Sequence, residues 1–174
     1  MKPIQLLVSF LVFSGAATAA QQPKDSNWEG LRPLLGKWTA EGGGQPGQAS
    51  AGGFSFDFDL QGKVLVRRNY SEYPATGGKP ASRHDDLMVI YQEPDQRTRA
   101  VYFDNEGHVI YYSVFLSEDK RTITLLSDSV PTAPRFRFIY TLLKDDSVSI
   151  EFDIAPPGKP DSFSRYVEGK ARRQ

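Results

Sequence analysis

The stretch Phe54-Ser55-Phe56-Asp57-Phe58-Asp59-Leu60 alternates apolar and polar side chains at every second position. Successive side chains of a strand point to opposite faces, so this pattern predicts a strand with one buried and one solvated face. Similar runs occur at 36–42, 63–73, 85–92, 98–104, 108–116, 121–127, 135–143, 147–154 and 163–172. Ten short strands predict an all-β protein, and we expect an antiparallel up-and-down β-barrel, with a two-sheet sandwich as the alternative.

The connections between these strands differ in length. If the strands run up and down in order, one end of the barrel receives the short turns at 61–62, 93–97, 117–120 and 144–146. The other end receives the connections at 43–53, 74–83, 105–107, 129–134 and 155–161. Four of these five are long and rich in Gly, Pro and Ser. We expect that end to be the mouth, because flexible loops around a concave opening are where barrels admit ligands.

Residues 1–19 have the features of a secretory signal. Lys2 precedes an apolar stretch at 4–13, and Ala17-Thr18-Ala19 fits the pattern of small residues at a cleavage site. The apolar stretch is too short to span a membrane comfortably. We therefore expect a periplasmic or secreted protein with no membrane span after cleavage, folded as a single domain over 20–174. A retained N-terminal anchor is the alternative.

A short helix is expected between this signal and the first strand. Ser26 and Glu29 have the spacing of a capping box, and Leu31 and Leu35 share a helical face. The predicted helix covers 27–35 and leads directly into the first strand. We expect it to plug the end of the barrel that carries the short turns.

Composition and motifs exclude several classes of function. The sequence has 21 Lys and Arg against 21 Asp and Glu, with no basic cluster, so nucleic acid is not an expected partner. No Cys is present, which excludes disulfides, thiolate metal sites and thiol nucleophiles. No Ser-His-Asp arrangement or phosphate-binding glycine loop is evident, so no catalytic or metal-ligating residues are assigned.

The segment Leu34-Leu35-Gly36-Lys37-Trp38-Thr39-Ala40-Glu41-Gly42 resembles the opening strand of the nitrobindin-like proteins. It is also similar to the Gly-x-Trp signature of the wider calycin group, which includes lipocalins and fatty-acid-binding proteins. The resemblance implies a ten-stranded calycin-like barrel. It further implies that Trp38, two residues after Gly36, seals the end of the barrel beneath an Arg of the last strand. Arg172 is the first candidate for that role and Lys170 the second.

The same resemblance raises the question of haem. The proximal ligand of nitrobindins is a His near the start of the last strand, where this chain has the segment 161–164, Asp-Ser-Phe-Ser. No His follows His108. Tyr166 could ligate ferric haem in principle, but a single Tyr on a strand is a weak signal. We therefore disfavour a haem site of the nitrobindin type and leave the cofactor unassigned.

Both histidines of the chain, His84 and His108, lie beside carboxylates. A turn centred near Gln96 would set Asp86 opposite Asp104, and the next turn would set Asp104 opposite His108. Directly opposed side chains in antiparallel strands lie ~5 Å apart, so these groups are expected to gather at the mouth. Three interpretations stay open: contact with a ligand or a metal ion, acid–base catalysis, and a hairpin turn with a solvated surface.

The segment 64–70, Val-Leu-Val-Arg-Arg-Asn-Tyr, contains a further candidate. Its even positions are otherwise apolar or aromatic, so Arg68 and Tyr70 are expected to face the interior. A buried guanidinium needs a carboxylate from the protein or from a ligand. The resemblance to fatty-acid-binding barrels favours a ligand. The alternatives are an internal ion pair and a register in which Arg67 faces inward.

Together these observations predict an exported protein that binds a small, largely apolar molecule in a barrel lumen, with an acidic group on that molecule as one option. The expected ligand contacts are Arg68, Tyr70, His84, Asp86, Asp104 and His108. One alternative is a metal-dependent or acid–base enzyme that uses the His and Asp cluster. Another is an accessory protein-interaction domain with no ligand in the lumen. The sequence identifies neither the ligand nor a protein partner.

Overall fold

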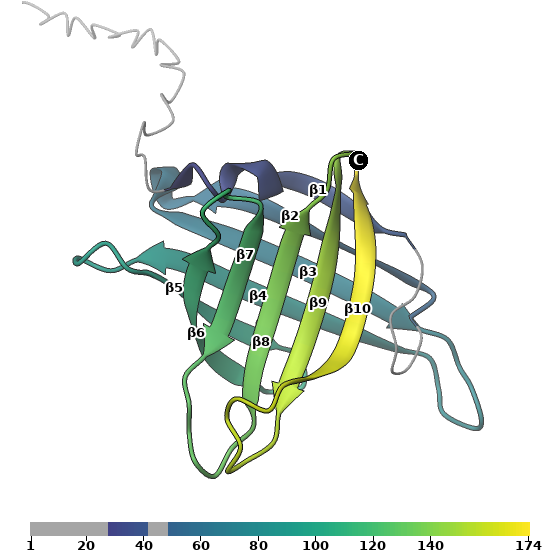
Figure 1. The fold of residues 1–174 in the computed structure, drawn as a ribbon. Coiled ribbons are helices and arrows are strands. Elements are labelled where there is room, and N and C mark those ends of the chain that lie inside the picture. Colours follow the sequence, from purple (N-terminus) through teal and green to yellow (C-terminus); the bar gives the residue numbers. More distant parts are fainter. Residues whose placement is uncertain (1–27, 42–48) are drawn as a thin grey trace, which may run out of the picture.

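The computed structural model describes residues 28–41 and 49–174. Ten antiparallel strands form one closed barrel (Figure 1), in which each strand pairs with its neighbours in sequence and β1 pairs with β10. The strands are β1 Gly36–Ala40, β2 Ala51–Asp59, β3 Val64–Tyr73, β4 Ser82–Gln92, β5 Thr98–Asp104, β6 Val109–Leu116, β7 Thr122–Ser127, β8 Arg135–Leu142, β9 Ser147–Ala155 and β10 Ser164–Arg173. The prediction of a ten-stranded up-and-down barrel is confirmed.

The two ends of the barrel differ as the connection lengths predicted (Figure 1). One end, called the plugged end below, carries the 3-10 helix η2 (Arg32–Leu34) and the short connections at 60–63, 93–97, 117–121 and 143–146. The first of these contains a second 3-10 helix, η3 (Leu60–Gly62). The other end, called the mouth below, carries the connections at 74–81, 105–108, 128–134 and 156–163. The tight turns hold non-glycine residues at positive φ, at Leu60, Gln61, Gln96, Lys120 and Asp146.

The segment before β1 closes the plugged end. Ser26, the predicted cap, lies outside the described residues, as does the predicted signal 1–19. From Trp28 onward the hydrogen bonds join residues three apart: Leu31 N–H donates to Trp28 O at 2.9 Å and Leu34 N–H donates to Leu31 O at 3.0 Å. This spacing gives tight 3-10 turns instead of the expected α-helix. Trp28, Leu31 and Leu34 are buried and form the plug. No described helix has the length and apolar character needed to cross a membrane.

Trp38 seals the plugged end, as the sequence resemblance implied. It is buried, and its indole N–H donates to the carbonyl of Leu34 at 2.8 Å. The cation over its ring is Arg173, whose Cζ lies 4.4 Å from the ring centroid. The expectation of Arg172 or Lys170 in this place was wrong. The register sets Trp38 directly opposite Arg173, so the two side chains share one face of the sheet.

Arg173 and Arg172 have different partners because neighbouring residues of a strand face opposite ways. Arg173 donates to the backbone carbonyls of Pro33 and Leu35 and so ties the plug to the last strand. Arg172 lies on the opposite face and forms an ion pair with Glu41. The last strand therefore contributes both to the seal and to the outer surface.

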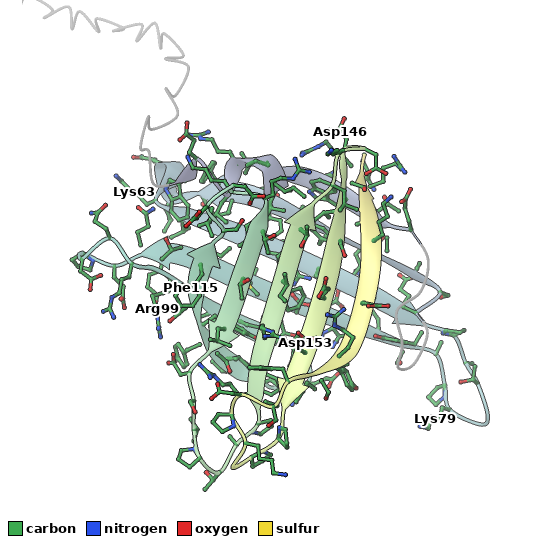
Figure 2. The ribbon with its side chains drawn as sticks, in the orientation of Figure 1. Lys63, Lys79, Arg99, Phe115, Asp146 and Asp153 are labelled. Carbon is green, nitrogen blue, oxygen red and sulfur yellow. The ribbon has the colours of Figure 1, made fainter. Side chains whose placement is uncertain are left out.

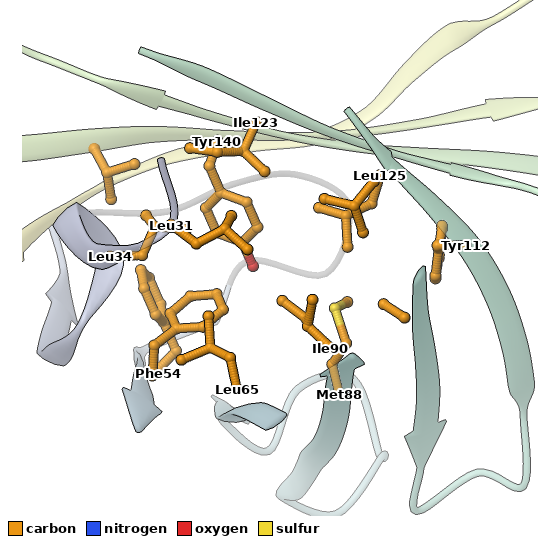
Figure 3. Close-up of a cluster of buried hydrophobic side chains, with 14 of the residues drawn as sticks. Leu31, Leu34, Phe54, Leu65, Met88, Ile90, Tyr112, Ile123, Leu125 and Tyr140 are labelled. Atoms are coloured by element: carbon orange, nitrogen blue, oxygen red, sulfur yellow. The ribbon is translucent and has the colours of Figure 1, made fainter. Parts of the chain in front are cut away.

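The inward faces of the strands meet in an apolar core (Figure 3). In its plugged half, Leu65, Ile90, Ile123 and Val148 have at most 1% of their surface exposed. Tyr140 of β8 lies against the same cluster and points its hydroxyl into the interior (Figure 3). This half of the barrel is packed like an ordinary protein core.

An ion cluster stabilises the outer wall. A β-bulge between Arg165 and Val167 places Arg165 opposite Asp153. The Asp153 carboxylate accepts hydrogen bonds from Arg137 Nε at 3.0 Å, from Arg137 Nη2 at 2.8 Å and from Arg165 Nε. Burial alone would raise the pKa of Asp153, but these two guanidinium groups hold it below its ordinary value. The Asp153 side chain is 2% exposed, yet both arginines remain about one third exposed, at 35% and 38%.

Candidate functional site

Four large apolar side chains lie near the mouth. Phe136 and Phe138 begin β8 after the 128–134 loop, Ile110 begins β6, and Phe152 lies toward the end of β9. Ile110, Phe136 and Phe138 pack against the core, Phe152 stacks on Phe136, and all four are only partly buried. These four side chains near the mouth therefore keep part of their apolar surface accessible. Exposed apolar surface in a concave interior is the usual setting of a small-molecule site.

The arginine that enters this interior is Arg67. Its side chain is 3% exposed, whereas Arg68 is exposed on the outer face. The register explains the difference, because it pairs Arg67 with inward Phe56 on β2 and with inward Met88 on β4. The expectation that Arg68 faces inward was wrong, and the alternative register was right. Val66 lies on the outer face but is also buried. Because an apolar residue stands at this even position, the even positions of the segment looked like those that face the core.

Tyr70 shares the outer face with Arg68. It lies beneath the guanidinium of Arg83, whose Cζ is 4.6 Å from the Tyr70 ring centroid. The expectation that Tyr70 faces inward was therefore also wrong. Neither residue can contact a molecule in the lumen.

Asp86 supplies the charge that Arg67 needs. Arg67 Nη1 donates to Asp86 Oδ1, and Asn69 Nδ2 donates to Asp86 Oδ2 at 2.8 Å. The Asp86 side chain is 5% exposed. Two buried opposite charges in contact compensate each other, so the interior needs no ligand carboxylate to balance Arg67. The internal ion pair was the other alternative that the sequence left open, and Arg67 forms it in place of Arg68.

Two packing contacts complete the surroundings of Arg67. Its Cζ lies 5.6 Å from the ring centroid of Phe54 and 5.2 Å from that of Phe138. Even so, Arg67 Nε–H has no hydrogen-bond acceptor, and neither does the hydroxyl of Tyr140. Buried polar atoms without a partner are rare in native proteins, so these two call for an explanation.

The predicted gathering of His and Asp residues is confirmed at the register level. Asp86 pairs with Asp104 across β4 and β5, as expected. His84 Nε2 lies 3.6 Å from Asp86 Oδ2 and 3.1 Å from Tyr102 Oη. Tyr102 Oη donates to Asp104 Oδ2 at 3.3 Å, and His108 Nδ1 lies 2.8 Å from the same Asp104 oxygen. A chain of polar contacts thus runs from the interior to the rim.

Tyr102 links the two halves of this chain, and sequence reasoning missed it. Its position could have been found, because it lies two residues before Asp104 and therefore on the same face of β5. The Tyr102 side chain is largely buried. Burial raises the pKa of its hydroxyl, and the carboxylates of Asp86 and Asp104 raise it further. Tyr102 is therefore protonated at every physiological pH.

His84 is the cationic member of the chain. Its contact with the Asp86 carboxylate is the main influence that raises its pKa to about 9, against the opposing effect of burial. Glu106 contributes as well, with Oε1 3.0 Å from His84 Nδ1. At neutral pH the imidazole is therefore protonated, and a protonated imidazole does not act as a general base. The arrangement is better suited to orienting a bound group than to proton abstraction.

Asp104 and His108, the members of this chain of polar contacts that lie nearest the rim, have a structural role. Asp104 Oδ1 accepts the backbone N–H of Glu106 at 3.0 Å and that of His108 at 2.9 Å, which fixes the turn between β5 and β6. Burial would raise the pKa of Asp104, but these backbone hydrogen bonds and the His108 ring hold it below its ordinary value. The His108 side chain is 61% exposed at the rim. For Asp104 and His108 the hairpin interpretation is thus supported.

Metal ligation is one of the roles that the sequence left open for these residues, and Tyr166 is the residue with the chemistry of a haem ligand. Within 28–41 and 49–174, no group of three or more His, Asp or Glu side chains has an arrangement that could hold a metal ion. Tyr166, the one possible haem ligand on β10, is 51% exposed and packs edge-on against Phe152 at 6.1 Å between ring centroids.

Apolar side chains also lie exposed on the outer wall of β5 and β6. Phe103 and Val109 are opposite each other, and the row continues along β6 with Tyr111 and with Phe115, which is labelled in Figure 2. A surface of this kind suits contact with another protein. It lies on the outside of the barrel and is separate from the polar chain in the interior.

Comparison with known proteins supports the fold. No family model matches the sequence, and no curated protein matches it. Among solved structures, the crystal structure of Rv2717c from M. tuberculosis matches with a TM-score of 0.56 and 15% sequence identity. The match covers 86% of this chain and 98% of that chain. Identity at this level indicates a shared barrel fold and carries no information about ligand or activity.

Proposed function

We propose that this protein binds a small, largely apolar molecule inside the barrel, admitted at the mouth. The observation that carries the proposal is the partial burial of Ile110, Phe136 and Phe138, three large inward-facing apolar side chains near the mouth. Covering such surface with a ligand is favourable by about 25 cal/mol per Å². The polar chain from Asp86 to Tyr102 lies beside this surface and would orient the ligand.

The proposal differs from the sequence-based expectation in one respect. Arg68 and Tyr70 face outward and have no part in it. Asn69 and Tyr102 take their place, since both lie on the inner face beside His84 and Asp86. An acidic group on the ligand is not required, because Asp86 already neutralises Arg67.

A fluorescence titration with the neutral apolar dye N-phenyl-1-naphthylamine tests the proposal. We expect saturable binding of one dye per barrel. Ile110→Trp places a large ring in the interior and should weaken dye binding by at least about tenfold. Val109→Trp, one residue earlier on the same strand, places the same ring on the outer wall. This matched control should bind the dye as the wild type does.

The two variants distinguish dye binding in the interior from dye binding on the outer surface. Loss of binding in Val109→Trp with retention in Ile110→Trp would assign the dye to the row on β5 and β6 and contradict the proposal. No saturable binding by the wild type would also contradict it. Circular dichroism should show that Ile110→Trp keeps the barrel, and Phe136→Trp offers a second interior variant. Native mass spectrometry of protein from its natural source would reveal a retained molecule directly.

We also propose that the protein is exported and belongs to the calycin-like barrels. Export is supported by the sequence of residues 1–19, and the mass of the mature protein should correspond to a chain that starts at Ala20. The calycin-like assignment is supported by Trp38, which follows Gly36 and lies under Arg173 of the last strand. Detection of the uncleaved chain in the cytoplasm would contradict export.

A further inference from the structure

Two buried hydrogen-bond donors in the interior have no acceptor. Arg67 Nε and Tyr140 Oη are each without one, and their side chains are 3% and 0% exposed. Burial raises the pKa of Tyr140, and the charge of Arg67 and a hydrogen bond from its guanidinium only partly offset this, so the hydroxyl keeps a proton for which there is no acceptor. Each unpaired donor in a dry interior carries a desolvation cost that an acceptor would remove.

The two donors share their surroundings. The Tyr140 ring lies 6.0 Å from the ring of Phe54 and 5.2 Å from that of Phe138, measured between centroids. The Arg67 guanidinium packs on the same two rings, at 5.6 and 5.2 Å. Of these rings, Phe138 is the one that solvent reaches. The donors therefore lie directly behind the accessible apolar surface of the mouth half.

The charge in this place favours an uncharged acceptor. Arg67 is already paired with Asp86, and Asp104 stands opposite Asp86 in the next strand. A ligand carboxylate at Arg67 would add a further buried negative charge next to Asp86. Like charges in a medium of low dielectric constant repel strongly, and the desolvation of a carboxylate adds to the cost. A carbonyl oxygen accepts two hydrogen bonds without either penalty.

We propose that the molecule bound in the barrel carries a neutral carbonyl-type oxygen, as in an amide, ester or ketone, which accepts hydrogen bonds from Arg67 Nε–H and Tyr140 Oη–H. This inference rests on the proposed binding function and specifies the class of ligand. The hydrocarbon part of the molecule would lie against Phe138, Phe136 and Ile110, toward the mouth.

Competition for the dye between two probes of equal chain length tests the inference. N-methyldodecanamide has a neutral acceptor, and dodecanoate is ionised at pH 8. For the wild type we expect the amide to displace the dye at about tenfold lower concentration than the carboxylate. Tyr140→Phe should reduce that preference about fivefold, as expected for one lost hydrogen bond. Tyr111→Phe, on the outer wall, is the matched control and should change nothing.

The stability of the variants supplies an independent readout. Because the Tyr140 O–H has no acceptor, Tyr140→Phe should unfold at the same urea concentration as the wild type or at a higher one. Tyr102→Phe removes a hydroxyl that contacts both His84 and Asp104, and it should unfold at a lower concentration. Arg67→Lys keeps the positive charge for Asp86 but lacks Nε–H, so it should also lose the preference for the amide.

Each other result overturns the inference. Equal or tighter binding of dodecanoate would show that the interior accepts an anion. A marked destabilisation by Tyr140→Phe with the amide preference intact would show that an internal water holds the hydroxyl. Dye binding without displacement by either probe would refute the ligand class and leave the binding function standing. Absence of dye binding would refute both together.

Discussion

Two buried aspartates, one inside the barrel and one on its outer wall, are held in different ways. Asp153 on the wall (Figure 2) accepts hydrogen bonds from two arginines that water can still reach. Asp86 in the interior is paired with Arg67, which is almost fully buried and keeps one donor unpaired. The outer cluster is complete and has an evident role in stability. The inner one is incomplete, which is more typical of a binding site than of a structural contact.

The largest loss of stability should come from breaking the ion pair between Arg67 and Asp86 inside the barrel. Asp86→Asn leaves the Arg67 guanidinium buried without a counter-charge and should lower the free energy of unfolding by about 3–5 kcal/mol. Urea denaturation followed by circular dichroism measures it. The double variant Arg67→Met with Asp86→Leu replaces both charges and should recover most of the loss. If Asp86→Asn alone costs less than about 1 kcal/mol, water reaches Arg67. The buried pair inside the barrel would then not differ from the Asp153 cluster on the outer wall.

The next largest effect concerns pH and His84. Its pKa of about 9 in the folded protein lies above the ordinary value of 6.5, so the protonated form stabilises the fold. This contribution is complete below pH 6.5 and is lost as the pH rises to 9, at a total of at most about 3 kcal/mol. Urea denaturation at several pH values measures it. His84→Gln should remove this pH dependence. A wild-type stability that is constant over this interval would disprove the assignment.

A smaller loss of stability is expected from replacing Asp153 on the outer wall. Asp153→Asn removes a charge from between Arg137 and Arg165, but both arginines can turn to water, and Arg165 keeps its ion pairs with Glu151 and Glu168. The expected loss is about 1–2 kcal/mol in the same urea assay. A loss equal to that of Asp86→Asn would mean that location inside or outside the barrel does not decide the cost.

The smallest effect is expected at Arg68. Its exposed side chain should tolerate replacement, so Arg68→Gln should change the unfolding free energy by less than about 0.5 kcal/mol. It should also leave dye binding as in the wild type. Arg67→Gln, one position earlier, removes the buried cation that is paired with Asp86 and serves as the comparison. A large effect of Arg68→Gln on dye binding would restore the original expectation for that residue.

The sequence predicted the barrel and the order of its strands because alternation and turn residues are local signals. The pairing of Asp86 with Asp104 also followed from a local turn. The two errors of orientation both concern adjacent arginines, Arg67 with Arg68 and Arg172 with Arg173. Alternation requires that one of each pair faces inward but does not say which one. That choice depends on Phe56, Met88 and Trp38, which lie on other strands and enter only through the register.

The pairing of β1 with β10 has a consequence for how the chain folds. Glu41 and Arg172, which meet beside this seam, are 131 positions apart in the sequence. Contacts of such high sequence separation form late and slowly, so the ring can close only after the C-terminal strand has been synthesised. Until then β1 and β9 present bare edges to other chains. We expect deletion of 164–173 to yield aggregates, and a chaperone that shields nascent strands to raise the yield of the intact protein.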